Sequence, residues 1–271
     1  MQNMYVGGFV ENNSKSLCLI RQRPSPKADR IFEALVQGWP NAKINIPGDI
    51  YVLWGLIGNN AEYMKNKYIF CDMPYHGRLQ GENYDESYWR WCYNGIHDNR
   101  QLNVPSDRFD NWNIKVEPYK TDGDYILVCP SSETMTRHEH GIGVEEWIAV
   151  VERQVRKHTN KPLKIRMKPR KNGTSGPSVA EIPIEKDLAG ASALLTSTSL
   201  TAIDALQRGV PVFSTSVNSP AAWCNNRDIS RINDPILYDR EKLFYNLAYK
   251  QFSINEMRDG SMYEILSKLS F

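Results

Sequence analysis

The alternation of strand-type and helix-type segments between residues 125 and 213 is the feature that most constrains the fold. Residues 125–129 form a continuous apolar run, which is typical of a buried strand. Five apolar residues then recur at helical spacing and predict an amphipathic helix: Val144, Trp147, Ile148, Val151 and Val155. Strands that alternate with helices across short loops indicate a parallel sheet covered by helices on both faces.

The same pattern continues through the rest of this half. We expect a strand over 163–169, a Gly/Ser/Pro-rich loop over 171–178, a short helix over 183–191 and a strand over 193–196. A helix with Leu200, Ile203 and Leu206 inward follows, and Gly209 stands in its C-cap position. The next buried strand covers 210–213. These segments together predict a Rossmann-like domain.

The first 120 residues show a weaker form of the alternation. Here the sequence predicts a helix over 28–36, a strand over 50–55, a helix over 59–66 and a strand over 68–72. Residues 84–95 are rich in Tyr and Trp and follow no clean period. The polar stretch 118–123 is the expected boundary between the halves, and the residues from Arg240 on predict two helices.

The fold class we expect is therefore α/β, with two Rossmann-like domains that face a cleft. The predicted divisions are 1–120 for the first domain, 121–240 for the second, and 241–271 for C-terminal helices that cross back to the first domain. A chain of 271 residues is long enough for such an arrangement, because domains usually contain about 100–200 residues.

Composition excludes several classes of protein. A mean hydropathy of −0.52 and the lack of a long apolar window argue against a membrane protein. The first residues lack a basic segment followed by an apolar one, so we expect no signal peptide. The five cysteines are odd in number and contain no C-x-x-C pair, which indicates reduced thiols and a cytoplasmic protein.

Two common nucleotide-binding fingerprints do not occur. The sequence has no G-x-G-x-x-G, which points away from a dinucleotide dehydrogenase, and no G-x-x-x-x-G-K-[ST] of a P-loop enzyme. Basic residues are instead concentrated between Glu152 and Lys171, where nine of them accompany one acid and give a net charge of +8. Such a window either attracts the phosphates of a nucleotide or nucleic acid, or is a solvated helix face with a lysine-rich turn.

Two motifs of the second half resemble the C-terminal domain of GT-B glycosyltransferases, particularly capsule-type and phage-borne ones. The first is Arg166-x-Lys168-Pro169-Arg170, and the second is the run from Thr196 to Val212, TSTSLTAIDALQRGVPV. The resemblance covers residues 125–225 well and the first half in outline. Asp204 stands where that family usually has Glu, and UDP-sugar epimerases and capsule-export proteins share the element.

The residues themselves favour a site for a nucleotide diphosphate. Thr198, Ser199 and Thr201 lie where a strand turns into a helix, so hydroxyls and free N–H groups converge on the positive helix end. Other candidates are placed at neighbouring strand ends or one turn into the helix: Ser131, Ser132, Lys168, Arg170 and, for the ribose hydroxyls, Asp204. Alternatively, the hydroxyls only cap the helix and Asp204 offsets its dipole.

A glycosyltransferase of this kind also needs a group that accepts the proton of the acceptor hydroxyl. Asp72 and His76 follow a predicted strand of the first half and are the candidates, with His97 and Asp98 as a second choice. Positive charge and helix N-termini can stabilise the leaving nucleotide diphosphate without a metal ion, so we expect no cofactor besides the nucleotide sugar, with a UDP-sugar as the first choice.

Two short motifs raise the question of a metal ion. Asp122-Gly123-Asp124 matches the D-x-D pattern of metal-dependent glycosyltransferases, but it precedes a strand instead of following one, so we expect a turn. His138-Glu139-His140 has no further ligand nearby and is expected in a loop, so we predict no metal site.

The first half also resembles small glycosyltransferase-like proteins of bacteriophages, through the segments 88–95 and 104–109. That resemblance implies the transfer of a sugar to hydroxymethylated bases of double-stranded DNA, with Arg78, Arg90 and Trp91 as acceptor contacts. Basic residues would bind the duplex and aromatic rings would stack on a flipped base, although such aromatics are more often core residues.

Three functional hypotheses remain open at this point. The protein is a glycosyltransferase that acts on DNA, a glycosyltransferase of the same fold that acts on surface carbohydrate or lipid, or a non-catalytic protein that binds nucleotide sugars or nucleic acid. An epimerase of the free nucleotide sugar is a fourth, minor hypothesis. The expected location is the cytoplasm, that of an infected host if a phage encodes the protein, and we expect no membrane partner.

Overall fold

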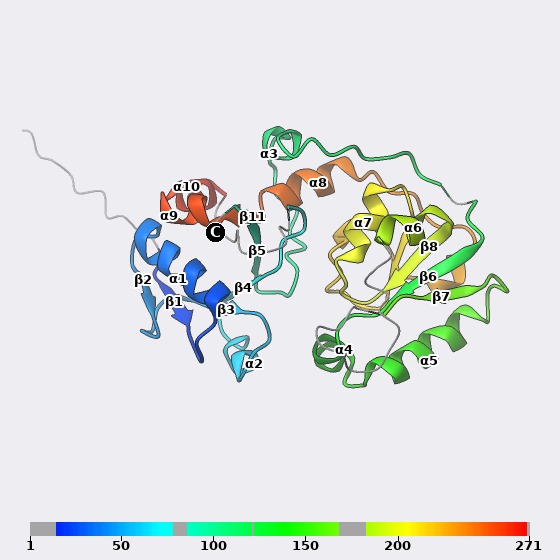
Figure 1. Cartoon of the computed structure of the whole chain (residues 1–271), viewed down its shortest axis with the longest axis horizontal. Coiled ribbons are helices and arrows are strands. Elements are labelled where there is room, and N and C mark those ends of the chain that lie inside the picture. The colour runs from blue at the N-terminus through cyan, green and yellow to red at the C-terminus, as the bar shows by residue number, and fades with distance from the viewer. Residues whose placement is uncertain (1–14, 78–85, 121, 168–182, 270–271) are drawn as a thin grey trace, which may run out of the picture.

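The chain forms two sheets that lie side by side (Figure 1). The computed structural model describes residues 15–77, 86–120, 122–167 and 183–269. The first sheet has six strands in the order β11-β5-β4-β3-β1-β2, and the second has five in the order β10-β9-β8-β6-β7.

All neighbouring strands of the second sheet are parallel. They are β6 (Tyr125–Cys129), β7 (Leu163–Ile165), β8 (Ala191–Thr196), β9 (Val212–Ser214) and β10 (Asn225–Asn226). In chain order the sheet reads 2-1-3-4-5, so the direction of winding reverses between β6 and β8. Ligands of open α/β sheets bind outside the carboxyl ends of the strands at such a switch point.

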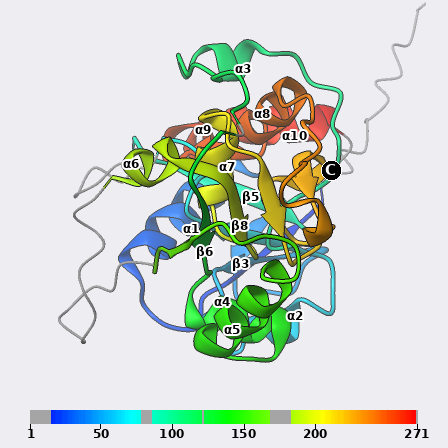
Figure 2. The same cartoon turned by 90° about the vertical axis from the view of Figure 1, so that its right-hand side faces the viewer.

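Helices cover both faces of the second sheet (Figure 2). On one face lies α5 (Val144–Val155), and its predicted apolar stripe is confirmed, because Trp147, Val151 and Val155 are buried against β6, β8 and β9. On the other face lie α6 (Ile184–Ala189) and α7 (Thr201–Gln207), which pack on Leu127 and Leu194. Before α5 comes α4 (Glu133–His140), which begins directly after β6.

The first sheet combines a parallel core with an antiparallel edge. Its strands are β1 (Leu17–Ile20), β2 (Ala42–Ile44), β3 (Ile50–Trp54), β4 (Tyr68–Asp72), β5 (Tyr88–Tyr93) and β11 (Gln251–Ser253). The pairs among β1 to β4 are parallel, whereas β5 pairs antiparallel with both β4 and β11. The first four strands have the order 2-1-3-4, as in the second sheet.

One face of the first sheet is covered by three helices, α1 (Pro26–Gly38), α9 (Ile254–Arg258) and α10 (Ser261–Lys268). Ser25 starts α1 by accepting a hydrogen bond from Ala28 N, and Pro26 follows as the first helical residue. The helix expected over 59–66 is reduced to the single turn α2 (Asn60–Tyr63).

The chain passes from the first sheet to the second and then returns. After α3 (Asp107–Asp110), an extended connection reaches β6, and α8 (Glu241–Ala248) brings the chain back beside α3 (Figure 1). The residues after Arg240 are not two helices, as the sequence predicted, but α8, strand β11, α9 and α10. Phe252 is fully buried in β11, because the strand completes the edge of the first sheet beside β5.

The predicted fold class is confirmed: two Rossmann-like domains face a cleft. A cluster of buried residues continues from the first sheet to the second and includes Phe70, Ile96, Leu127 and Phe244. No helix in the part of the chain that the structure describes is both long and apolar enough to span a bilayer.

Candidate functional site

A pocket of about 330 Å³ lies at the switch point of the second sheet. Its second-domain wall is formed by the residues that follow β6 and β8, together with Arg166 after β7 and Asp204 in α7. Its first-domain wall is formed by Asp72, Met73 and Arg90. The pocket therefore joins both domains at the place where open α/β sheets bind ligands.

Hydrogen bonds between two loops fix the shape of the second-domain wall. Ser131 Oγ lies 2.9 Å from Thr198 Oγ1, and Thr198 N donates to Ser131 Oγ at 3.1 Å. Thr196 Oγ1 donates to the carbonyl of Cys129 at 2.6 Å. Ser131 and Thr198 are both buried, so these bonds hold the β6 and β8 loops together at the floor of the pocket.

Two helices begin at this wall. Ser132 is the N-cap of α4 and accepts a hydrogen bond from Met135 N at 3.4 Å, while Ser199 accepts one from Thr201 N at 3.4 Å. Ser132 therefore caps α4, whereas α7 has Leu200 at its N-cap position and no side-chain cap, so the alternative that the hydroxyls only cap this helix is not what the structure shows. The positive ends of both helices lie at the pocket wall, where they favour an anion.

Arg90 and Arg166 are the cationic side chains that the described residues contribute to the pocket lining. Arg90 is 4% exposed and donates to the Met73 carbonyl at 3.1 Å and to Asp72 Oδ2 at 3.2 Å. Arg166 forms an ion pair with the buried Asp187. Each guanidinium thus has a carboxylate partner, which fixes its position and offsets part of its charge.

Asp72 lies on the first-domain side of the pocket at the carboxyl end of β4. It pairs directly with Arg90 of β5 in the antiparallel register, and its Oδ1 accepts a hydrogen bond from Met73 N at 2.7 Å. The side chain remains 28% exposed. A carboxylate held in this way, open to the pocket, can accept a proton from a bound hydroxyl.

Asp204 lines the same pocket from the first turn of α7. Burial, followed by the nearby charge of Glu185, raises its pKa to about 6. Arg208 and Arg166 act in the opposite direction and do not compensate. The carboxyl is therefore poised to change charge just below neutral pH.

The other predicted site residues are placed differently. His76 does not line the pocket, because its backbone is bonded to Gln251 and its ring stacks on Trp112 at 5.1 Å. Trp91 is 1% exposed and packs among core residues on the helix-covered face of the first sheet, so the prediction that it contacts an acceptor is corrected. Three predicted cationic residues lie outside the described residues: Arg78, Lys168 and Arg170.

The second choice for a proton acceptor is also corrected by the structure. His97 and Asp98 are 3% and 4% exposed, and both are hydrogen-bonded within the protein. His97 Nε2 lies 3.0 Å from the Thr198 carbonyl oxygen, and Asp98 is paired with Arg100 and Lys250. Neither group is available to a substrate in this conformation.

Much of the basic window is occupied by the protein's own groups. Arg156 and Lys161 donate to the carbonyls of Lys161 and Gly123, and Lys164 pairs with Asp187 at 2.6 Å. Of the described residues in the window, Arg166 and Met167 reach the pocket lining. Their acidic partner, Asp187, lies outside the window. It offsets part of the +8 charge that the sequence of the window alone indicates.

His138-Glu139-His140 belongs to α4 and not to a loop as expected. His140 Nε2 lies 2.7 Å from Ser197 Oγ, and Glu139 accepts hydrogen bonds from Ser216 and Asn218. The motif thus anchors the end of α4 to the loops that follow β8 and β9. No group of three or more His, Cys, Asp or Glu side chains suited to a metal ion occurs among the residues described.

Arg166 is a charged pocket residue that is not among the predicted ligands. It belongs to the basic window and to the first motif of the resemblance, but the predicted ligands are Lys168 and Arg170 further along. The available signal was its position directly after the apolar end of β7, where a side chain reaches the edge of the sheet.

A second pocket, of about 360 Å³, lies at the corresponding switch point of the first sheet, beside β1 and β3. It is lined by Tyr51 and Tyr63 and by polar side chains that are bonded to one another or to nearby loops, such as Gln22 to Asn60 at 2.6 Å. All residues that line it belong to the first domain, in contrast to the pocket between the two domains.

Comparisons with known proteins find no family model and no curated protein that match this chain. Among solved structures, a similar one is KpsC of Thermosulfurimonas dismutans, described as a beta Kdo 2,7 transferase. It is 14% identical with a TM-score of 0.46, and the match covers 93% of this chain and 99% of that chain. At this level of similarity the roles of individual residues depend on the geometry of this chain.

Proposed function

We propose that the protein transfers a sugar from a nucleotide-sugar donor to an acceptor hydroxyl. The observation that carries the proposal is the composition of the pocket between the domains. Its second-domain wall offers helix N-termini, hydroxyls and Arg166, and the opposite wall offers Arg90 and the open carboxylate of Asp72. A leaving diphosphate and an attacking hydroxyl need these two kinds of surface, facing each other.

In this proposal the diphosphate of the donor binds at the starts of α4 and α7. The Ser199 hydroxyl, one hydroxyl of the hydrogen-bonded pair Ser131 and Thr198, and first-turn N–H groups would donate to its oxygens. Arg90 and Arg166 would stabilise the charge that develops as the glycosidic bond breaks. Asp204 would accept hydrogen bonds from the ribose, and the predicted ligands Lys168 and Arg170 would add positive charge. A UDP-sugar remains the expected donor.

Asp72 is the proposed general base. It would take the proton of the acceptor hydroxyl as the oxygen attacks the anomeric carbon, while Arg90 holds the carboxylate in place through its 3.2 Å bond. His76, the other predicted candidate, would have to leave its stacked position on Trp112 to take part. The geometry therefore favours the carboxylate.

For the acceptor, a hydroxymethylated base in double-stranded DNA stays our first prediction and a surface carbohydrate the alternative. Both present a primary or secondary hydroxyl to the same carboxylate. The two are separated by salt dependence, because binding that neutralises phosphates weakens steeply with salt. Duplex binding should fall between about 50 and 200 mM salt if DNA is the acceptor, whereas a neutral oligosaccharide should show little change.

The first test is thermal unfolding with a panel of nucleoside diphosphates and nucleotide sugars. A ligand at 100 times its Kd should stabilise the protein by about 2.7 kcal/mol, equivalent to several degrees in Tm. A shift with one diphosphate and its sugar conjugate supports a donor site. If no nucleotide shifts Tm, the proposal fails.

The second test separates catalysis from binding. Asp72→Asn keeps an oxygen that can accept from Arg90 but removes the base, so we expect turnover to fall about 10²–10⁴-fold with the nucleotide-induced Tm shift retained. Asp234→Asn, at a carboxylate 90% exposed in the second domain, is the matched control and should keep full turnover. Unchanged turnover in Asp72→Asn would refute the assigned base. If the wild type binds a nucleotide but transfers no sugar, the protein is a non-catalytic binding protein. If it changes the sugar of the free nucleotide sugar with no acceptor present, it is an epimerase.

A further inference from the structure

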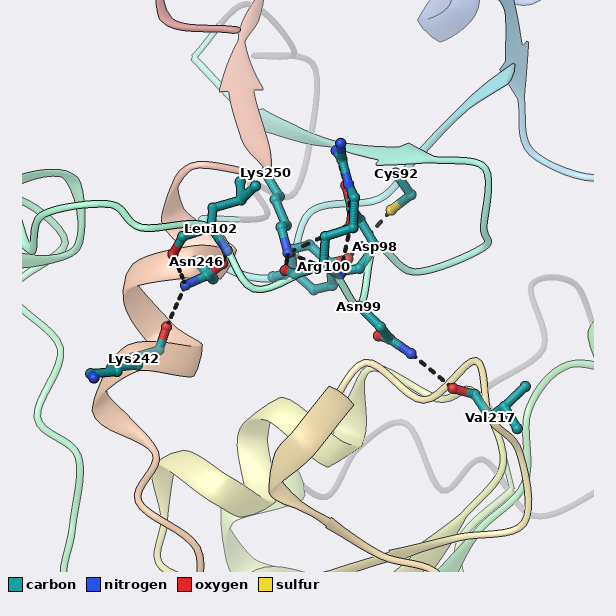
Figure 3. Close-up of polar contacts among 10 residues, drawn as sticks. Cys92, Asp98, Asn99, Arg100, Leu102, Val217, Lys242, Asn246 and Lys250 are labelled. Carbon is teal, nitrogen blue, oxygen red and sulfur yellow. Dashed lines mark hydrogen bonds and ion pairs between the residues drawn. The ribbon is translucent and has the colours of Figure 1, made fainter. Parts of the chain in front are cut away.

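A loop of the first domain reaches across the cleft and touches the second domain twice. This loop, residues 94–103, follows β5 and is here called the crossing loop. His97 Nε2 lies 3.0 Å from the Thr198 carbonyl oxygen, and Asn99 Nδ2 donates to the Val217 carbonyl at 2.8 Å (Figure 3 shows the second contact). Both contacts are made to backbone carbonyls of loops that follow strands of the second sheet.

The chemistry of the first contact fixes the state of the imidazole. A carbonyl oxygen can only accept, so Nε2 carries the proton and Nδ1 does not. Burial, followed by the charge of Arg90, lowers the pKa of His97 well below its ordinary value, so the ring is neutral near neutral pH. Nδ1 is buried and has no hydrogen-bond partner in the described parts of the chain. The ring is thus held by one polar bond, the one to Thr198.

Thr198 is the centre of the turn that forms the floor of the pocket. Its side chain and its N–H are both bonded to Ser131, and its carbonyl is bonded to His97. The turn is therefore fixed from two directions, by the β6 loop of its own domain and by an imidazole of the other domain. Ser199 and Thr201, which follow in the chain, also line the pocket.

We propose that His97 is a positioning residue for the donor-binding turn, acting across the domain interface. It holds the Thr198 carbonyl and thereby fixes the course of residues 198–201 along the pocket, and the donor site is complete only while this hydrogen bond is formed. This inference deepens the proposed glycosyl transfer and rests on it for the identity of the ligand. His97 itself touches no substrate.

The test uses two nearly isosteric variants of the full-length protein. His97→Gln places an amide N–H at the Nε2 position, whereas His97→Met fills similar space without a donor. His97→Asn, whose amide lies at the Nδ1 position, is a second variant without the donor in case His97→Met does not fold. Asn99→Ala is the matched control, because it removes the other contact of the same loop and no residue of the pocket.

The readouts are the Kd and KM for the nucleotide that stabilises the wild type, with kcat at saturating donor. We expect His97→Met to raise Kd and KM about tenfold, roughly the worth of one hydrogen bond, with kcat changed less. His97→Gln should restore binding to within about threefold, and Asn99→Ala should bind as the wild type does. Equal binding by His97→Met and the wild type, or equal losses in His97→Met and Asn99→Ala, would overturn the proposal.

Hydrogen exchange of residues 196–201 separates this inference from the proposed function. Without any nucleotide, exchange should be faster in His97→Met and near the wild-type rate in His97→Gln. If the wild type binds no nucleotide, glycosyl transfer fails as a function, and this exchange pattern still decides whether His97 positions the turn. Unchanged exchange in His97→Met would refute the positioning role independently of any ligand.

Discussion

At the scale of single residues, the neighbours Arg90 and Trp91 of β5 show how one step along a strand separates site from core. Side chains of a strand alternate between the two faces of the sheet. Arg90 therefore shares the pocket side with Asp72, whereas Trp91 and Trp89 pack against the helix-covered face. The sequence predicts that both Arg90 and Trp91 contact the acceptor, because an aromatic-rich strand without a clear period does not reveal which of its faces packs into the core.

Asp204 gives a prediction about pH at this scale. Its pKa is raised from 3.8 to about 6 in the folded protein, so between these values the folded state binds more protons than the unfolded state. The free energy of unfolding must therefore fall as pH rises through this window. Asp204→Asn removes the effect. It should gain about 2–3 kcal/mol relative to the wild type between pH 4 and pH 7, measured by urea unfolding.

The same substitution should weaken nucleotide binding, since an amide is a poorer acceptor for ribose hydroxyls than a carboxylate. Gained stability with lost binding would mark Asp204 as a functional group. Asp228→Asn is the control of opposite sign, because hydrogen bonds from Ser230 lower the pKa of Asp228 and its contribution is lost as pH falls. A difference between Asp204→Asn and the wild type that does not vary with pH would contradict the argument.

The residue scale also shows where sequence reasoning about the site reached its limit. Ser131, Thr198 and Asp204 could be assigned to the pocket because strand ends of a parallel sheet meet at one edge. The pairing of Lys164 and Arg166 with Asp187 could not be predicted, because it joins residues that lie far apart in the sequence. The state of His97 depends likewise on Thr198, which comes from another domain.

At the scale of elements, segments with an apolar run or a helical period were predictable, whereas the strands β1, β2 and β11 of the first sheet were not. The helix α5 has a clear period of apolar residues and the strand β6 is a continuous apolar run, whereas β1 and β11 have only four and three residues. The strand β11 exists because β5 provides an edge to which it can pair. Whether such a short strand forms depends on the strand with which it pairs more than on its own sequence.

The close approach of α9 to α1 gives a prediction for Gly38. A Cβ at this position would lie 2.0 Å from the Met257 carbonyl oxygen and 2.8 Å from that of Arg258, closer than any packing allows. Both obstacles are backbone, so Gly38→Ala must push the two helices apart. We expect a loss of about 2–4 kcal/mol in the free energy of unfolding, measured by denaturant titration.

The control for Gly38→Ala is Gln37→Ala, one residue earlier on the same helix and exposed to solvent. It should change stability by less than about 0.5 kcal/mol. Because the crossing loop and the pocket belong to the other face of the sheet, Gly38→Ala should also leave nucleotide affinity unchanged under conditions where the protein is folded. Equal stability of the two variants would contradict the packing argument.

At the scale of the whole molecule, the returning chain and the crossing loop are joined by a buried ionic cluster. Lys250, between α8 and β11, donates to the carbonyls of Asp98 and Arg100 (Figure 3). Its ammonium also lies 3.7 Å from Asp98 Oδ1. Asn246 adds two bonds to the backbone of Leu102, one of them at 2.6 Å. The C-terminal return of the chain thus fixes the loop that contacts the second domain.

Lys250 is consequently expected to support both domains, although it lies far from the pocket in the sequence. The ammonium has three N–H donors and three acceptors around it, and burial lowers its pKa to about 8. Lys250→Met would remove the ammonium from Asp98 and from the buried Asp98 carbonyl and the partly buried Arg100 carbonyl, at a cost of about 2–4 kcal/mol. Hydrogen exchange should quicken in residues 96–102 and also in 196–201, because His97 is carried by the loosened loop. Lys242→Met, the same change at an exposed position of α8, should alter neither stability nor exchange. Faster exchange confined to residues 96–102 would show that the donor-binding turn does not depend on the crossing loop.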